Sequence, residues 1–158
     1  MNAQYSIRRE QWVPRPLEEV FAFFSDAQNL DLLTPGFLHF QILTAGPIRI
    51  APGATLQYKL RVHGVPVRWT TEIIRWDPPH SFEDVQRSGP YRHWHHTHLF
   101  EPADGGTRMT DEVRYSLPFG LLGRAVHALI VRRDVERIFD YRYDRIRERF
   151  GGPPRGQP

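Results

Sequence analysis

Residues 55–73 read TLQYKLRVHGVPVRWTTEI, and this stretch decides the fold. On each side of His63-Gly64, apolar and polar residues alternate almost one by one. A period of two is typical of a β-strand with one buried face and one face in water. A Gly between two such runs fits a tight hairpin turn. The stretch therefore predicts two antiparallel strands that share an apolar face.

The same period continues on both sides of this hairpin. Short β-like runs are separated by turns rich in Gly, Pro and Asp, and they are expected at 4–13, from about 38 to 46, and at 81–87, 91–101 and 107–117. Successive hairpins predict an antiparallel sheet, here with seven strands.

Helical spacing occurs in two places. Between residues 16 and 34, apolar residues at helical intervals and the break at Ser25-Asp26 predict two short helices. Over 121–150 a long helix is expected, with an apolar stripe formed by Leu122, Val126, Leu129, Val135, Ile138, Arg142, Ile146 and Phe150. A single long helix must bury its stripe against the sheet, which predicts an α+β fold in which a curved sheet wraps around the helix. Space left between the two layers would form a ligand cavity.

The chain has 158 residues, the size of one domain. We expect a single domain over residues 1–150 and a disordered tail, GGPPRGQP, over 151–158. The net charge of +3 is matched by the Arg excess of 121–150, where acidic residues alternate with Arg as on a solvated helix.

Composition excludes several classes of chemistry. The absence of Cys excludes disulfides, thiol nucleophiles and cysteine-based metal sites. Lys59 is the only lysine, and alternation points it outward, away from any buried Schiff-base chemistry. No Gly-rich phosphate loop or basic block indicates a nucleic-acid partner. No apolar segment is long enough for a membrane span or a signal core, so we expect a cytoplasmic protein without stable membrane insertion.

Four histidines lie within six residues, in the run RHWHHTHLF of residues 92–100. Strand alternation divides them between two faces. We expect His96 and His98 to point inward, because Trp94 and Phe100 share their face, and His93 and His95 to lie on the surface. Asp84 and Gln86 on the preceding strand and Asp111 on the following strand are predicted to join the inner pair.

This polar group permits several interpretations. It can be a hydrogen-bonded network that fixes the sheet, or a row that recognises a ligand's polar end. It can also be catalytic, with His96 as a general base whose basicity Asp84 or Asp111 raises. A metal bound by two His and a carboxylate is the weakest alternative, and we expect no cofactor and no metal. The catalytic candidates are His96, His98, Asp84 and Asp111. The candidate ligand-binding residues are Tyr58, Trp69, Asp84, Gln86, Trp94, His96, His98 and Tyr115.

Three segments carry a resemblance to a known family: FAFFSDAQNLDLLTPGFLHF (21–40), FEDVQRSGPYRHWHHTHLF (82–100) and LPFGLLGRAVHALIVRRDVERIFDYR (117–142). Over about residues 4–150 the chain resembles the helix-grip fold of the START/Bet v 1-like (SRPBCC) superfamily, and within it the bacterial ligand-binding proteins related to the polyketide cyclase/dehydrase group. The resemblance implies a hydrophobic cavity for a small lipophilic molecule. It also implies that the segment 118–123 can gate the cavity mouth.

Three functions follow as hypotheses. The first is a monomeric or homodimeric binding protein for a lipid, polyketide or aromatic-like molecule, without obligatory catalysis. The second is a cyclase or dehydratase that uses His96 or His98 as base, assisted by Tyr115 or Asp84. The third is an interaction protein that uses the Arg-rich helix or the segment 118–123 on a partner or an anionic membrane.

Overall fold

A computed structural model describes residues 3–157, so Met1 and Asn2 of the predicted domain and Pro158 of the predicted tail lie outside the described residues. The sheet has seven antiparallel strands in the order β1-β7-β6-β5-β4-β3-β2. The strands are β1 (Gln4–Val13), β2 (Gln41–Ile42), β3 (Thr55–Val62), β4 (Val65–Asp77), β5 (Ser81–Ser88), β6 (His93–Ala103) and β7 (Gly106–Ser116). This confirms the predicted seven-stranded α+β fold.

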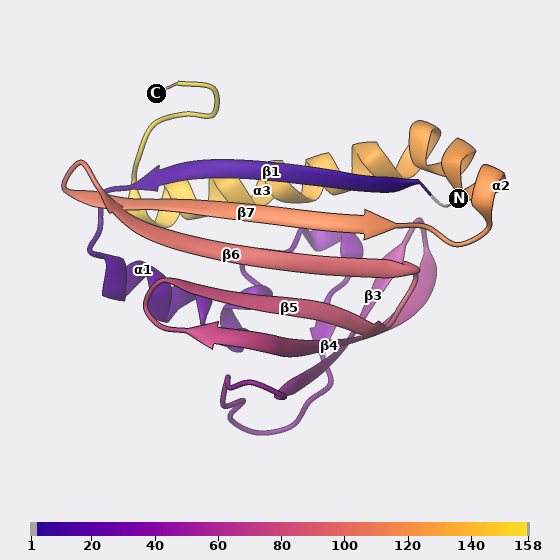
Figure 1. Cartoon of the computed structure of the whole chain (residues 1–158), viewed down its shortest axis with the longest axis horizontal. Helices are drawn as coiled ribbons and strands as arrows, with labels where there is room; N and C mark the ends of the chain where they lie inside the picture. Colours follow the sequence, from indigo (N-terminus) through magenta and orange to yellow (C-terminus); the bar gives the residue numbers. More distant parts are fainter. Residues whose placement is uncertain (1–2, 158) are drawn as a thin grey trace.

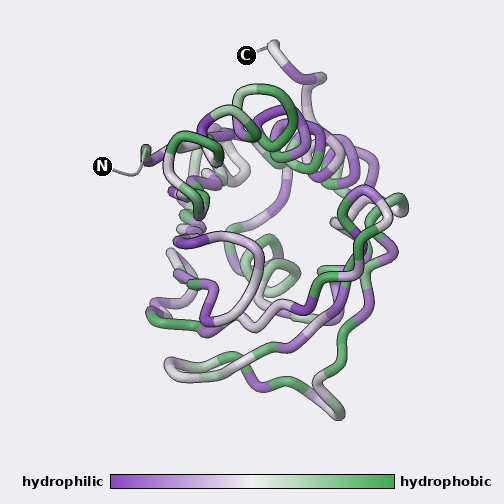
Figure 2. The backbone as a smooth tube through the Cα atoms, turned by 90° about the vertical axis from the view of Figure 1, so that its right-hand side faces the viewer, coloured by the Kyte–Doolittle hydropathy of each residue, from purple (hydrophilic) through white to green (hydrophobic). Residues whose placement is uncertain are grey.

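The helices lie on one side of the curved sheet. Helix α1 (Leu17–Phe24) and two 3₁₀ turns (Ala27–Leu30 and Gly36–Leu38) follow β1, and α2 (Gly120–Val126) and α3 (Arg132–Phe150) end the fold. In Figure 1, α3 runs behind β1 and β7 for most of their length. Figure 2 views the molecule end on, where the sheet curves round from α3 and the chain closes into a ring. Among residues 3–157, no helix is long and apolar enough to cross a membrane.

The curvature of the sheet has a local cause in β4 and β5. Their pairing shifts register between Thr70 and Thr71 and again between Ile73 and Arg75. Such irregularities leave an extra residue on one strand and bend it.

β2 is only two residues long and therefore shorter than predicted. The backbone N–H groups of Leu43 and Thr44 both donate to the Gln57 carbonyl, and the ladder ends there.

One end of the space between sheet and helices is filled by a hydrophobic core. Phe21 and Phe24 of α1 pack against Phe100 of β6, and Ile146 and Phe150 of α3 belong to the same cluster. These side chains are buried because the apolar faces of α1, β6 and α3 meet at this end. The other end of the same space stays open.

The long C-terminal helix contains a π-helical segment, His127–Val131, between α2 and α3. In α3 the predicted stripe is buried at Val135, Ile146 and Phe150. Before α3 the prediction differs from the structure, because Leu129 is 77% exposed and His127 is buried instead. A π turn holds more residues than an α turn and so shifts which residues face the sheet.

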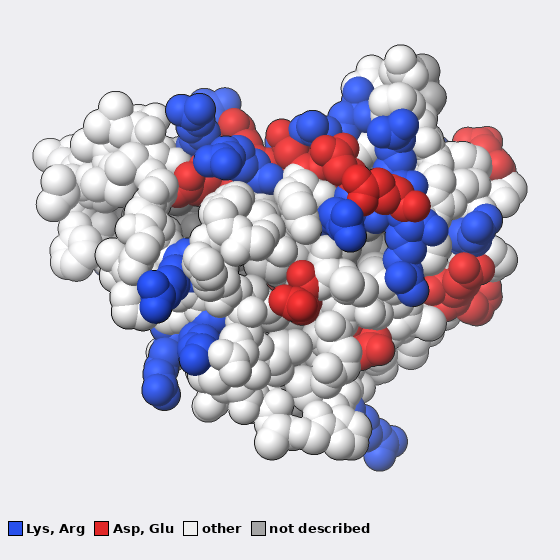
Figure 3. All heavy atoms as spheres, turned by 180° about the vertical axis from the view of Figure 1, so that it is seen from behind, with Lys and Arg blue, Asp and Glu red and all other residues white. Residues whose placement is uncertain are grey.

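The surface of α3 agrees with the solvated face that its sequence predicts. Figure 3 shows Arg and acidic side chains interleaved along this face, while the lobe at the α2 end is largely uncharged. Arg132 pairs with Glu136 and Arg145 pairs with Glu148, each within one turn of the helix.

Residues 151–157, for which composition predicts a disordered tail, contact α3 in the structure, and their disorder stays a prediction. The Tyr143 hydroxyl donates to the Pro153 carbonyl at 3.2 Å, and Arg155 pairs with Asp140 and Asp144 at 2.8 and 3.2 Å. Composition could not reveal these contacts, because the partners of these residues lie on α3. The domain boundary at residue 150 stays a prediction.

Candidate functional site

A cavity of about 910 Å³ lies between the curved sheet and α3. Its volume is in the upper part of the range of small-molecule sites. Most of its wall is apolar or aromatic, and Tyr58, Trp69 and Trp94 contribute to it. On the side of the β3–β4 turn, His63 Nε2 lies 2.6 Å from the Asp134 carboxylate of α3 and links the sheet to the helix. The cavity wall becomes polar where β5, β6 and α3 meet.

The polar wall is positioned by the register of β5, β6 and β7. Asp84 of β5 lies directly opposite His96 of β6, and His98 lies opposite Asp111 of β7. Directly opposed residues project from the same face of a sheet. His96, His98 and Asp111 are buried, whereas His93 is exposed and His95 binds Glu83 at 2.7 Å on the outer face. The two faces therefore divide the histidines as alternation predicts.

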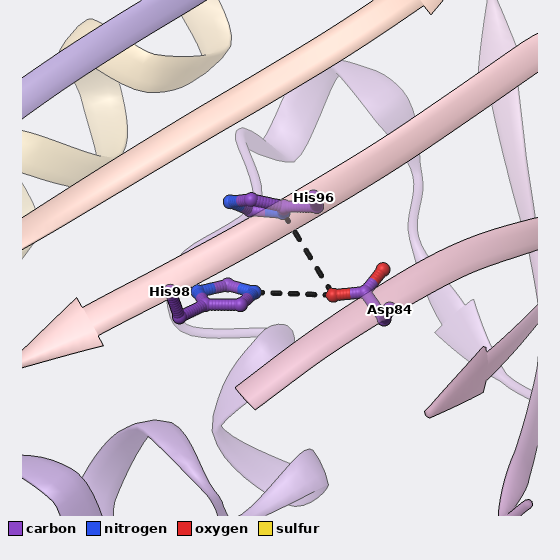
Figure 4. Close-up of side chains that lie close together, drawn as sticks. All are labelled: Asp84, His96 and His98. Carbon is purple, nitrogen blue, oxygen red and sulfur yellow. Dashed lines mark hydrogen bonds and ion pairs between the residues drawn. The ribbon is translucent and has the colours of Figure 1, made fainter. Parts of the chain in front are cut away.

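The two inner imidazoles lie between the two carboxylates. Nε2 of His96 and Nδ1 of His98 lie 3.0 and 2.9 Å from Oδ1 of Asp111. On the other side, Nε2 of His98 and Nδ1 of His96 lie 3.1 and 3.9 Å from Oδ2 of Asp84 (Figure 4). Each imidazole thus has one nitrogen toward Asp111 and the other toward Asp84.

Two further side chains hold the carboxylates. Nε of Arg142, from α3, lies 3.2 Å from Oδ2 of Asp111, and the Thr71 hydroxyl donates to Oδ1 of Asp84 at 3.1 Å. The Arg142 and His98 contacts to Asp111 are ion-pair distances whose angles do not suit hydrogen bonds, so Nε of Arg142 and Nδ1 of His98 are buried donors with imperfect partners.

Burial and neighbouring charges determine which members of this polar group are ionised. Burial alone would raise the pKa of Asp111, but the Arg142 charge and the two imidazoles hold that pKa well below its usual range. The pKa of Asp84 is lowered as well, because the histidines and Thr71 outweigh the effect of its burial. Both carboxylates are therefore ionised at neutral pH.

The pKa values of the two histidines shift in opposite directions. Burial and the charge of His98 lower the pKa of His96 to about 4, which the hydrogen bond to Asp111 only partly offsets. For His98, burial is outweighed by its contacts with Asp111 and Asp84, which raise its pKa. His96 is thus neutral, and its Nε2–H donates to Asp111, which leaves the lone pair on Nδ1. Asp111 and Asp84 each raise the pKa of His96, as expected, but burial outweighs both carboxylates.

Two predicted ligand-binding residues lie outside the cavity wall. The side-chain amide of Gln86 closes the β5–β6 turn by pairing with the backbone N and O of Tyr91, at 3.2 and 2.6 Å. Tyr115 is buried, and its hydroxyl lies 2.9 Å from Nε2 of His127. Strand alternation places both residues on the expected face. The amide of Gln86 bonds to the backbone of the β5–β6 turn, however, and the hydroxyl of Tyr115 bonds to His127 of the π segment.

Sequence reasoning did not assign Arg142 or Thr71 to the polar group. The available signal for Arg142 was its place in the apolar stripe of the long helix, where a charged residue needs a buried partner. Thr71 gave no comparable signal, since Thr is an ordinary residue in strands.

Comparisons with known proteins identify the family and the fold. Residues 4–151 match the model of the family described as polyketide cyclase / dehydrase and lipid transport. No curated protein matches the sequence. Among solved structures, the protein TTHA0849 from Thermus thermophilus is 20% identical, with 92% of this chain and 99% of that chain covered and a TM-score of 0.68.

Two further solved structures have the same fold. Ara h 8.0201 is 17% identical, with 93% and 97% of the two chains covered and a TM-score of 0.64. A point mutant of norcoclaurine synthase from Thalictrum flavum, in complex with a transition-state analogue, is 16% identical, with 94% and 98% covered and a TM-score of 0.65. At these identities the likeness concerns the fold alone. Because the family model matches residues 4–151, the chain belongs to the polyketide cyclase/dehydrase and lipid-transport family, and the three solved structures share its fold.

Proposed function

We propose that the protein binds a small hydrophobic molecule in the cavity between the curved sheet and α3, and that binding does not require catalysis. The observation that carries this proposal is the cavity of about 910 Å³ with its mainly apolar wall. An apolar cavity with a few polar groups at one place favours a ligand that is largely hydrophobic and carries one polar end.

The wall supports a lipid, polyketide or aromatic-like ligand. Trp69 stacks on Tyr58 with ring centroids 5.8 Å apart and meets Trp94 edge to face at 5.3 Å. Aromatic rings give a flat ligand large contact area at low entropic cost. Asp84, His96 and His98 lie in the same wall and can accept or donate hydrogen bonds to a polar group of the ligand.

The first experiment is native mass spectrometry of the protein as purified from cells, which should detect a co-purifying hydrophobic compound. The second is a fluorescence titration with N-phenyl-1-naphthylamine. Val62→Trp places a large ring in the cavity wall and should abolish or strongly weaken probe binding. Gln57→Trp, on the exposed face of the same strand, should leave it unchanged. Equal binding by both variants would overturn the proposal.

A cyclase or dehydratase is the second candidate, and one observation favours it. His96 is held by Asp111 so that Nδ1 carries a lone pair in the cavity wall. An oriented imidazole nitrogen can take a proton from a bound molecule. The test incubates the recovered compound with the protein and with His96→Gln, and follows loss of water or ring closure by mass spectrometry. Conversion that persists in the variant would exclude this role for His96.

The same proposal includes a monomer or homodimer in the cytoplasm, with no nucleic-acid partner. The expected absence of a nucleic-acid partner is supported by the acids interleaved with Arg along α3, since ion pairs such as Arg132–Glu136 and Arg145–Glu148 weaken the field that a polyanion would meet. Light scattering at several protein concentrations gives the oligomeric state. Binding to duplex DNA that weakens steeply with salt would contradict the expected partner class.

A further inference from the structure

Asp84, His96 and His98 place three ligand-type atoms in the cavity wall within 4.8 Å of one another. Oδ2 of Asp84 lies 3.1 Å from Nε2 of His98 and 3.9 Å from Nδ1 of His96. A metal bound at about 2.1 Å to each of three tetrahedral ligands separates those ligand atoms by roughly 3.4 Å. The three side chains therefore need only small shifts to surround an ion.

The remaining nitrogens of both imidazoles are held by a second carboxylate. Nε2 of His96 and Nδ1 of His98 lie 3.0 and 2.9 Å from the same oxygen of Asp111, and Arg142 contacts the other oxygen of Asp111. Metal-binding histidines almost always donate their second ring N–H to such an outer partner, which orients the ring and raises its affinity for the metal. Asp111 performs that task for His96, and it lies at ion-pair distance from Nδ1 of His98.

The donor atoms of Asp84, His96 and His98 favour a transition metal. Two nitrogens and one oxygen suit first-row divalent transition metals, whereas Ca²⁺ and Mg²⁺ prefer sets made only of oxygen.

The outer face of the same strand offers a natural comparison. His93 and His95 repeat the His-x-His spacing, but their ring centroids lie 6.5 Å apart and His95 is occupied by Glu83. Within residues 3–157, Asp84, His96 and His98 are the group of His and acidic side chains that comes close enough to hold an ion. The two histidine pairs have the same spacing in the sequence. They differ in the carboxylates that flank them in the structure.

We propose that Asp84, His96 and His98 bind one divalent transition-metal ion, with open coordination positions toward the cavity and Asp111 as the outer carboxylate. From the sequence we expected no metal, because the His-x-His spacing is a weak pattern by itself. The structure adds that Asp111 lies beside the second nitrogen of each imidazole. The inference goes beyond hydrophobic-ligand binding, since an open position lets the ion take an oxygen of the bound molecule and polarise it.

The test uses the full chain without a histidine tag, stripped of metal by a chelator. Zn²⁺ is titrated by calorimetry and Co²⁺ by visible absorption, whose intensity distinguishes four-coordinate from six-coordinate cobalt. The wild type should bind one equivalent of each. Asp84→Asn should weaken Zn²⁺ binding by more than ~100-fold, and Asp111→Asn by about 10–100-fold as for other outer partners of metal ligands.

His93→Gln with His95→Gln is the matched control and should leave both titrations unchanged. Asp84→Asn keeps the side-chain size and can still accept the Thr71 hydrogen bond, so its fold, checked by circular dichroism, should persist. Zn²⁺ binding that survives in folded Asp84→Asn, or that is lost in the outer-face control, overturns the proposal. Naphthylamine-probe binding without any metal binding would remove the metal site and leave the proposed ligand binding intact.

Discussion

Arg142 lies on the inner stripe of α3, and its guanidinium contacts the Asp111 carboxylate in the buried polar group. Its side chain is 11% exposed and that of Asp111 is 5% exposed, so water cannot replace either partner. The guanidinium also lies 5.2 Å from the ring centroid of Phe24. Arg142 thus ties the C-terminal helix to both β7 and the core.

Arg142→Met should therefore destabilise the protein strongly. Removing one partner of a buried pair leaves the other charge unpaired and typically costs about 3–5 kcal/mol. Arg145→Met, nearby on the same helix, breaks an exposed pair with Glu148 and should cost less than about 1 kcal/mol. Urea unfolding followed by circular dichroism measures both, and similar losses for the two variants would contradict a buried role for Arg142.

At the scale of elements, the connection from β7 to α2 is unusual in its backbone and its surface. Phe119 adopts φ 71° and ψ 26°, a left-handed conformation that L-residues rarely take. Its side chain is 79% exposed, and Leu121 and Leu122 beside it are 80% and 66% exposed. Phe119 and Leu122 also border the cavity. The predicted gating role of the segment 118–123 stays a prediction, and this exposed apolar border is where it would act.

Phe119→Gly should be more stable than Phe119→Ala by roughly 1 kcal/mol, because Gly adopts the left-handed conformation without a Cβ clash. Both variants remove the exposed ring, so their difference isolates the backbone. Chemical unfolding measures it. A Gly variant no more stable than the Ala variant would show that the backbone at residue 119 is not strained.

His127 in the π segment should give stability a pH dependence. Its ring stacks on Tyr5, and its Nε2 lies 2.9 Å from the Tyr115 hydroxyl. Burial and the charge of Arg132 lower the pKa of His127 below 6.5, which Glu136 only partly offsets. Below about pH 6.5 the unfolded chain therefore binds more protons at this residue than the folded chain does, and stability falls with falling pH.

His127→Gln lacks this titration. The stability advantage of the wild type over His127→Gln should therefore shrink as the pH is lowered from about 8 to about 5. Urea unfolding of both proteins across this range measures the advantage. A constant difference would mean that His127 titrates alike in the folded and unfolded states.

At the scale of the whole molecule, the core at the α1 end and the cavity divide the space between sheet and helices. Residues 151–157 lie outside both, and their contacts with α3 include exposed ion pairs and one hydrogen bond. Exposed pairs contribute little to stability. The fold from β1 to the end of α3 is thus expected to be stable by itself.

Ending the chain after Gly152 should lower the free energy of unfolding by less than about 1.5 kcal/mol. Probe binding in the cavity should be unchanged, since none of the deleted residues that the structure describes borders it. Urea unfolding and the naphthylamine titration measure these two effects. A shortened chain that fails to fold would show that the domain extends beyond residue 150.

Alternation by itself determined the strands other than β2, the inward faces of β3, β4 and β6, and the division of the four histidines. These features follow from local backbone geometry, in which neighbouring side chains point to opposite faces. Only the tertiary structure decided which polar groups share a contact. Arg142 reaches Asp111 from the C-terminal helix, and the turn and the π segment take Gln86 and Tyr115 away from the cavity. Register, sheet curvature and helix phase set these contacts, and they arise only when distant segments pack together.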